Sequence, residues 1–465
     1  MKDELPPHSA AYKRVVILLL MTAYTFNAMD RNIISIVSQS MKLDLKLTDT
    51  QLGLLSGTAF ALLYAFGGIP IARLAERFSR VNIIAGALVV WSTLSALCGA
   101  AVAFSQLLMI RVGVGVAEAG CSPPAHSLIS DYFGRSRRTS ALSIYSCGSS
   151  LGYLLAAVGG GYVAQRWGWR AACAMVGLPG IVIAILIKAA VREPAREPSF
   201  LPAFSPGAEL RELGAVCRML LCERAVLHMI LGVTIGGFAA YGFYAFLPPY
   251  FSRNYELGYA TVGVILGLAG GVAVGLGIAA GGFVADALAA RNSRWYALVP
   301  ALGGVIALPF YASGVLQPDW KVATCLLSIA GFFQYTSLGP TFGVIQNIAG
   351  PRRRATATAF LYICLSVFAL GGGPLFTGWI IDRFAQSDFH AAGSSFAANC
   401  PGGAAAAAAG AGLRSACRSA LAHATKDGLL VTLLFFGWAC VHYFLASAGI
   451  GTALKAASSV QSDST

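Results

Sequence analysis

The stretch VVILLLMTAYTFNAMDRN, residues 15–32, opens the first of many long apolar segments and carries an acid and a base within it. A helix needs roughly 20 apolar residues to cross the hydrocarbon core of a bilayer. Segments of that length recur along the 465 residues, of which 57% are hydrophobic and 11% are charged. Because about a quarter of the residues in a soluble domain are charged, this composition predicts an integral membrane protein.

Twelve apolar segments can be marked, and a Pro-rich, charged connection separates the first six from the last six. They lie at 15–40, 51–72, 81–103, 106–130, 139–164, 171–190, 227–251, 258–285, 295–315, 321–347, 355–381 and 428–452. The predicted fold is all-α, with twelve transmembrane helices in two pseudo-symmetric six-helix bundles. The expected domains are an N-terminal bundle at 1–191, a cytoplasmic linker at 192–224, a C-terminal bundle at 225–454 with an extracytoplasmic loop at 384–425, and a disordered tail at 455–465.

The distribution of basic residues predicts the orientation. With the N-terminus inside, the cytoplasmic loops hold about twice as many Lys and Arg residues as the outer loops, so both termini are expected in the cytoplasm, in a bacterial inner membrane. These short basic loops also account for the net charge of +13. Because no basic stripe interleaved with aromatic residues occurs, no nucleic-acid partner is expected.

Four ionisable residues interrupt the apolar pattern: Asp30 and Arg31 in the first segment, Arg111 and Glu118 in the fourth. A charge at the centre of a membrane helix costs about 2.5–3.5 kcal/mol, so such residues usually mark an ion or substrate pathway. Arg111 and Glu118 are two helical turns apart and therefore point to the same side.

These charges predict a proton-coupled substrate site. Asp30 and Glu118 are the expected proton carriers, while the guanidinium groups of Arg31 and Arg111 suit a phosphate or a carboxylate. Aromatic residues of the seventh segment, Tyr241 and Tyr244 among them, could contact an acyl or aromatic tail. No metal or cofactor is expected, and the proton gradient would supply the energy. The competing interpretation is a pair of structural ion pairs that lock segments one and four, and both could hold in different conformations.

Internal echoes support two equivalent halves. Residues 134–141 resemble 350–357, and residues 72–77 resemble 282–287. Charged residues in and near these loops are candidate gate residues, although solvated topology signals would look the same. The candidate gate residues are Asp49, Arg73, Glu76, Arg77, Arg138, Asp286 and Arg354. Asp49 could instead serve only as an acid at a helix N-terminus.

Two cysteines fall in the long outer loop, unlike most of the eleven, which lie singly in apolar segments. Because the outside of an inner membrane is oxidising, a Cys400–Cys417 disulfide is possible there.

An enzyme is not expected. The stretch Gly148-Ser-Ser-Leu-Gly152 matches a hydrolase elbow, but that motif needs a strand, a turn and a helix, and here it lies inside a charge-free apolar segment. Glycines in such a segment are typical of close helix packing.

The loop between segments two and three resembles the Gly-x-x-x-Asp-Arg-x-Gly-Arg signature of the major facilitator superfamily. The matching positions here are Ala72, Glu76, Arg77, Ser79 and Arg80. The equivalent loop of the second half keeps the glycine and the acid as Gly282 and Asp286, and the fourth segment keeps Arg-x-x-x-Gly as Arg111 and Gly115.

The first half further resembles the spinster-like branch of that superfamily, in residues 29–32, 48–54 and 115–133. The resemblance implies a monomeric, proton-coupled secondary transporter that moves an amphiphilic lipid, such as a lysophospholipid or a sphingoid lipid, by alternating access. A transporter of small organic or aromatic acids is the alternative within the same class. A membrane receptor or subunit without transport is the alternative from another class.

Overall fold

The computed structural model describes residues 9–133, 135–194, 206–390 and 395–462, and these form helices and connecting loops without a strand. Ten described helices are long and apolar enough to cross a membrane. One of them, Ser140–Ala190, covers two predicted segments and bends at Gly168, where φ is 83°. Outside these ten, α1 (Ala10–Leu45) is a further long helix with Asp30 and Arg31 inside it. With Ser140–Ala190 counted as two segments and α1 added, the described helices correspond to the twelve predicted segments. The all-α, twelve-helix membrane fold is therefore confirmed.

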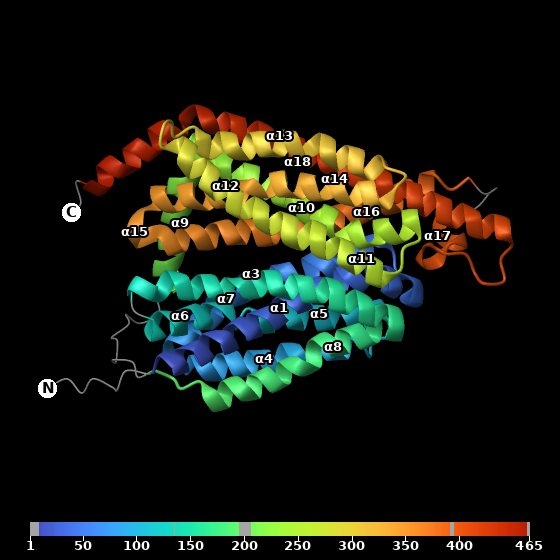
Figure 1. Cartoon of the computed structure of the whole chain (residues 1–465), viewed down its shortest axis with the longest axis horizontal. Helices are drawn as coiled ribbons and strands as arrows, with labels where there is room; N and C mark the ends of the chain where they lie inside the picture. The colour runs from blue at the N-terminus through green and yellow to red at the C-terminus, as the bar shows by residue number, and fades with distance from the viewer. Residues whose placement is uncertain (1–8, 134, 195–205, 391–394, 463–465) are drawn as a thin grey trace. The chain divides into compact units, whose positions relative to one another are not determined.

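The helices divide into two compact units. The first comprises the described residues of Met1–Leu45, Ala59–Ser199 and Gly258–Val264. Its main helices are α1, α3 (Ala59–Arg77), α4 (Arg80–Cys98), α5 (Phe104–Glu118), α6 (Ser122–Tyr132), α7 (Arg135–Leu155) and α8 (Gly161–Ala190) (Figure 1). α1 packs along α7 and α8, and α4 packs against α5 and α8.

Small residues set the spacing of these helices. A Cβ atom at Gly152 on α7 would lie 2.3 Å from the carbonyl oxygen of Thr25 on α1, so this contact accepts only glycine. Apolar side chains fill the remaining space, and Leu20, Leu88 and Ile187 are fully buried. The close approach of α1 to its neighbours holds its charged residues inside the unit.

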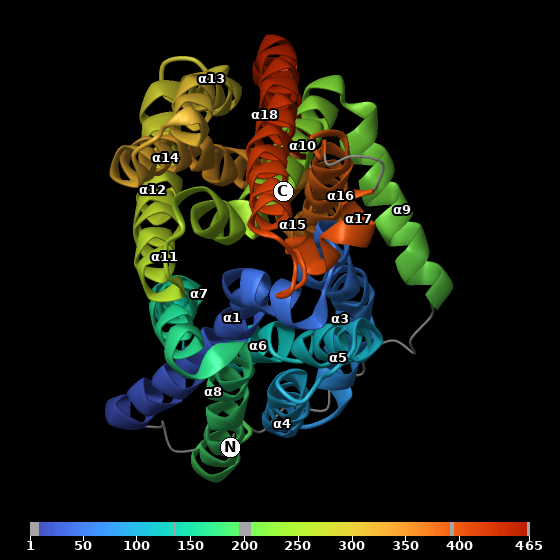
Figure 2. The same cartoon turned by 90° about the vertical axis from the view of Figure 1, so that its right-hand side faces the viewer.

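The second unit comprises the described residues of Lys46–Thr58, Phe200–Leu257 and Ile265–Thr465. Its helices include α2 (Asp49–Gly53), α9 (Pro206–Cys222), α10 (Arg224–Tyr255), α12 (Ala273–Ala289), α13 (Trp295–Leu316), α14 (Trp320–Gln334), α15 (Leu338–Cys364), α16 (Gly371–Ser387), α17 (Phe396–Asn399) and α18 (Ala411–Ser462). α10 and α18 lie side by side and pack extensively (Figure 2). α15 bends at Gly350, where φ is 69°.

Each unit contains a short stretch whose chain neighbours belong to the other unit. Residues 46–58 belong to the second unit, although the chain on both sides of them belongs to the first. Conversely, residues 258–264, which include most of α11 (Tyr259–Leu266), belong to the first unit. The units therefore differ from the simple division of the sequence into a first and a second half.

In the part of the chain that the structure describes, four π-helical turns interrupt the long helices. They are η1 (Leu54–Thr58), η2 (Ala156–Gly160), η3 (Gly267–Val272) and η5 (Leu365–Leu370). Along the chain, η1 and η3 are separated by nearly the same number of residues as the repeated sequence stretches of the two halves. The same holds for η2 and η5. The turns thus recur at equivalent places in the two halves, and such turns are frequent at functional sites.

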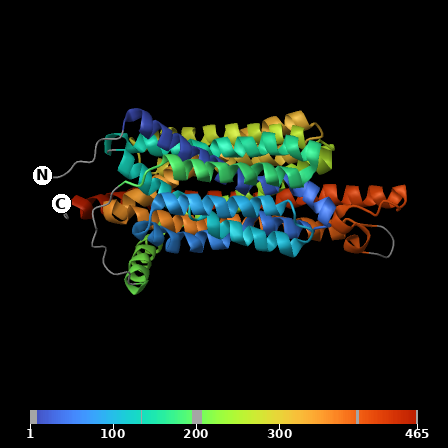
Figure 3. The same cartoon turned by 90° about the horizontal axis from the view of Figure 1, so that it is seen from below.

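Two segments are more ordered than expected. The second part of the predicted linker forms α9 (Figure 1), which packs against α10 and α15 and buries Val216 and Leu220. The prediction of a disordered tail is wrong for 455–462, because these residues continue α18. Alanines favour a helix at this end. At the opposite end, where α18 begins beside α17, Figure 3 shows this helix, drawn in red, extending past its neighbours.

Candidate functional site

Two ion pairs connect α1 to α5 inside the first unit. The Nε atom of Arg31 donates to Oε2 of Glu118 at 2.7 Å, and Nη1 of Arg111 donates to Oδ2 of Asp30 at 3.2 Å. Neighbouring side chains on a helix diverge by about 100°. Both nevertheless contact α5, because the long side chain of Arg31 can bend toward it. The structure thus brings all four predicted charged residues together.

These two pairs differ in their access to solvent. The side chains of Asp30, Arg111 and Glu118 are nearly fully buried, whereas that of Arg31 is 27% exposed. The carboxyl groups of Asp30 and Glu118 also interact electrostatically, so the two pairs form one charge system. Arg31 is therefore the most exposed member of this system.

Aromatic rings of α3 cover the guanidinium groups. The Cζ atom of Arg31 lies 4.4 Å from the centre of the Tyr64 ring and 5.2 Å from that of Phe60. The Cζ atom of Arg111 lies 5.5 Å from the Phe60 ring. Cation–π contacts stabilise a cation without using its N–H donors, so they leave those donors available.

Several buried polar atoms of this site have no hydrogen-bond partner among the residues that the structure describes. They are Nη2 of Arg31, Nε of Arg111 and Oε1 of Glu118. An unpaired buried polar group is costly. A ligand oxygen at the arginines and a proton at the Glu118 carboxylate would relieve that cost.

The two predicted tyrosines lie in the second unit, on α10. Tyr241 is 43% exposed. The hydroxyl of Tyr244 lies 3.4 Å from that of Tyr311, inside an aromatic cluster with Phe243 and Tyr335. Tyr244 thus packs among aromatic rings, whereas Tyr241 presents a more exposed ring.

Asp49 is buried at the start of α2, within the second unit. Its carboxylate accepts hydrogen bonds from both terminal nitrogens of Arg253, at 2.6 and 3.2 Å, and Arg253 also donates to Thr425. Asp382 of α16 accepts from the backbone N–H groups of Asp49 and Thr50, at 2.9 and 2.8 Å. Asp49 is therefore both a helix N-terminal acid and part of a buried charge cluster.

The other candidate gate residues are distributed differently. Asp286 is exposed and accepts from the Tyr296 hydroxyl at 3.0 Å, and Arg354 is exposed and donates to the Gln346 carbonyl at 3.4 Å. The remaining four lie on α3 and α7, and their side chains are outside the part of the chain that the structure describes: Arg73, Glu76, Arg77 and Arg138.

Sequence reasoning missed a second charge cluster in the first unit, around the buried Arg80. The Arg80 side chain is 1% exposed, and its guanidinium donates to Glu193 at 2.7 Å, to Asp131 at 2.5 Å and to Ser127 at 2.8 Å. The Ser79 hydroxyl and the Val81 N–H also donate to Glu193. Arg80 is the last residue of the signature in the loop between segments two and three. That position was the sequence signal from which this cluster could have been found.

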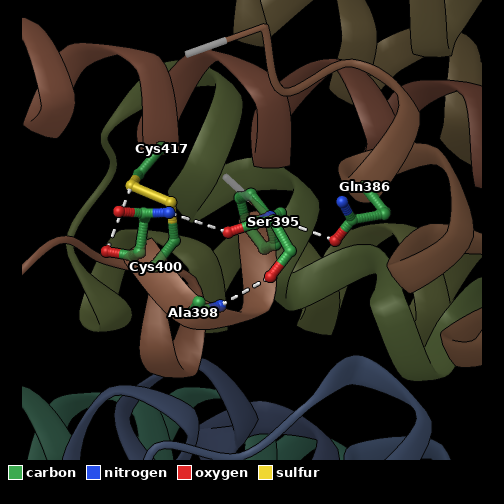
Figure 4. Close-up of a disulfide and its surroundings, with 7 residues drawn as sticks. Gln386, Ser395, Ala398, Cys400 and Cys417 are labelled. Atoms are coloured by element: carbon green, nitrogen blue, oxygen red, sulfur yellow. Dashed lines mark hydrogen bonds between the residues drawn. A yellow bond between two sulfur atoms is a disulfide. The ribbon is translucent and has the colours of Figure 1, made fainter. Parts of the chain in front are cut away.

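In the loop between α16 and α18, Cys400 and Cys417 are joined by a disulfide between the end of α17 and the first turns of α18 (Figure 4). The Ser395 hydroxyl accepts from Ala398, and Gln386 of α16 accepts from the Phe396 N–H at 3.0 Å. The loop is therefore tied to both helices that it connects.

A helical membrane bundle with opposed charges buried between two of its helices has the features of a secondary transporter. Residues 20–373 match the Major Facilitator Superfamily, which covers well over half of the chain, so the chain belongs to that family. Within the family it lies in the spinster-like branch.

Solved and curated relatives agree with that family. A crystal structure of a bacterial homologue of the human lysosomal transporter Spinster, inward-facing and unoccupied, is 31% identical, covers 96% of this chain and 99% of its own, and superposes with a TM-score of 0.85. An MFS-type efflux pump of Mycolicibacterium smegmatis is 31% identical over 77% of this chain and 82% of its own length. A hexuronate transporter of Bacillus subtilis is 24% identical over 82% of this chain and 89% of its own.

These similarities establish the general activity. The chain is an integral membrane transporter and not an enzyme. The hypothesis of a receptor or subunit without transport is therefore set aside.

Proposed function

We propose that this chain is a proton-coupled transporter that moves an amphiphilic anionic or zwitterionic lipid, of the lysophospholipid or sphingoid type, across a bacterial inner membrane by alternating access. The observation that carries the proposal is the joined pair system of Asp30, Arg31, Arg111 and Glu118. It would act as a monomer. Both of its termini would lie in the cytoplasm, as the distribution of basic residues among the loops favours.

Proton transfer and substrate binding would compete at Arg31. A proton on Glu118 neutralises its carboxylate and removes the partner of the Arg31 guanidinium. That guanidinium, partly exposed and with Nη2 buried and unpaired, then takes a phosphate or carboxylate oxygen of the substrate. Loss of the proton restores the ion pair and expels the headgroup. Gain or loss of the proton on Glu118 would also affect Asp30, because the two carboxyl groups interact electrostatically.

The buried cluster around Asp49 would be the outer gate. Opening it separates Asp49 from Arg253 and the N-terminus of α2 from Asp382. Breaking a buried pair is expensive, so this gate would stay closed until substrate or proton binding compensates. Asp286 and Arg354, with Arg73, Glu76, Arg77 and Arg138, would form the inner gate, because acids recur at equivalent loops of the two halves.

A small organic or aromatic acid is the second candidate substrate. The arginines would hold any carboxylate, and a relative named as a hexuronate transporter supports this candidate. The two candidates differ in the apolar tail, which the lipid has and a small acid lacks.

The test is flux in proteoliposomes under an imposed pH gradient, with labelled lysophospholipid, a sphingoid phosphate and an aromatic acid. We expect gradient-driven lipid movement by the wild type and at least a tenfold loss in Glu118→Gln, because glutamine cannot exchange a proton. Glu256→Gln is the matched control, since its side chain is 77% exposed and outside the site. Movement of the acid alone would contradict the lipid assignment, and unchanged flux in Glu118→Gln would contradict the proton assignment.

A further inference from the structure

Two histidines face each other in the second unit, away from the proposed transport site. His228 lies in the second turn of α10 and His442 lies on α18. Their Nδ1 atoms are 2.9 Å apart, and the ring centres are 5.1 Å apart with planes tilted by 33°. Both side chains are half-buried.

The helices that carry them are held at a fixed spacing. One turn after His228, a Cβ atom at Gly232 would lie 3.0 Å from the ring of Tyr443, the residue next to His442. A Cβ at Gly449 would likewise lie 3.2 Å from that of Ala225. Contacts this close on both sides hold the imidazoles opposite each other before any ligand binds.

Two Nδ1 atoms at this distance share a single hydrogen, because one imidazole must donate and the other accept. A metal ion can take a lone pair from both Nδ1 atoms once the donor ring changes tautomer, so that its proton moves from Nδ1 to Nε2 and each ring stays neutral. Zinc–nitrogen bonds of about 2.0–2.1 Å with tetrahedral angles place two ligand nitrogens roughly 3.3 Å apart. The rings therefore need to separate by only a few tenths of an ångström, which side-chain torsions can supply.

We propose that His228 and His442 form a binding site for a borderline divalent transition metal such as Zn²⁺, Co²⁺ or Ni²⁺, with water in the remaining positions. Imidazole suits these ions, whereas Mg²⁺ and Ca²⁺ require oxygen ligands. No third His, Cys, Asp or Glu of the described residues completes a cluster with them. The site should therefore bind more weakly than a structural zinc site and act by fastening α10 to α18.

The test is thermal unfolding of the full-length purified protein, prepared with an affinity tag that lacks histidine, in increasing ZnCl₂. We expect the midpoint temperature to rise by several degrees in the wild type and in His423→Ala, a control at an exposed histidine of the outer region. The rise should be absent in His228→Ala and in His442→Ala. MgCl₂ should have no effect on any of them.

Absence of the rise in the wild type would overturn the proposal. Its persistence in both histidine variants would also overturn it and would assign the metal to exposed cysteines such as Cys222. If either alanine variant fails to fold, Co²⁺ absorption decides the question on the wild type and on His442→Gln. Visible bands of tetrahedral cobalt in the wild type, lost in the glutamine variant, support the site, and bands absent from the wild type refute it. Neither result depends on the transported substrate.

Discussion

At the scale of single residues, Arg80 joins three parts of the first unit through one guanidinium group. It begins α4, contacts Ser127 and Asp131 of α6, and pairs with Glu193 just after α8. Removing one partner of a buried ion pair leaves a charge without compensation. This arginine therefore holds the ends of three helices together, where a transporter must change shape without unfolding.

Glu193 should make stability depend on pH. Partial burial opposes its ionisation, but the Val81 N–H, Arg80 and the Ser79 hydroxyl together outweigh burial and hold its pKa below the ordinary range. A carboxyl group with a lowered folded pKa stabilises the protein above the ordinary glutamate pKa, and that contribution is lost as pH falls through the folded value. Glu193→Gln should cost about 1–2 kcal/mol at neutral pH.

The measurement is the unfolding midpoint of the wild type and of Glu193→Gln in detergent, from pH 7 down to about pH 3.5. The difference between the two proteins should be largest at neutral pH and shrink below the ordinary glutamate pKa. A difference that stays constant over this range would show that Glu193 acts by packing alone.

The sequence identified the four charges of α1 and α5 because they stand out within apolar segments. Arg253, Asp382 and Glu193 could not be identified in that way, since charges are common at helix ends and in loops. Their burial depends on which ends meet in the fold, and no pattern along the chain records that.

At the scale of elements, α2 packs on α16 without room for side chains. A Cβ atom at Gly378 would lie 2.1 Å from the carbonyl oxygen of Asp49, and one at Gly53 would lie 2.1 Å from that of Pro374. A capping box formed by Thr48 and Gln51 begins α2, and the π-turn η1 follows it. The short helix is thus defined at both ends and fixed along its face.

Gly378→Ala should therefore weaken this contact. The added methyl group forces α2 away from α16, at a cost of about 1–3 kcal/mol as for other overpacked cores. Gly275→Ala is the control, because its Cβ would meet no atom within 4 Å and alanine favours a helix. Unfolding midpoints of both variants and the wild type give the comparison. Equal midpoints for the two variants would contradict the close packing described.

Hydropathy located the long helices but not their interruptions. A π-turn adds one residue to a helical turn and leaves the apolar character unchanged, so η1, η2, η3 and η5 leave no mark in the sequence pattern. α9 was missed for a different reason. Its neighbouring prolines and charges indicate a linker, and the burial of Val216 and Leu220 becomes evident only once α10 and α15 are in place.

At the scale of the whole molecule, the basic loops predict that α9 is cytoplasmic and that the first turn of α18 is outside. Cys222 on α9 is exposed, and so is Arg414 on α18. The other exposed free cysteines of the described residues, Cys147 and Cys325, are first changed to serine so that they are not labelled. When Arg414→Cys is added to that variant, a membrane-impermeant maleimide should label the new cysteine in intact cells. Cys222 should be labelled only in inside-out vesicles. Labelling of Cys222 in intact cells would reverse the proposed orientation.

The exchange of segments 46–58 and 258–264 between the two units determines how chimaeras of this transporter should be built. A hybrid joined at the middle of the chain would take 46–58 from one parent and its packing partner α16 from the other, so Gly53 and Gly378 would meet unmatched surfaces. A hybrid keeps these contacts when residues 46–58 come from the parent that supplies the second unit and residues 258–264 come from the parent that supplies the first unit. Compensating substitutions between relatives should likewise link α2 to α16 rather than to α1.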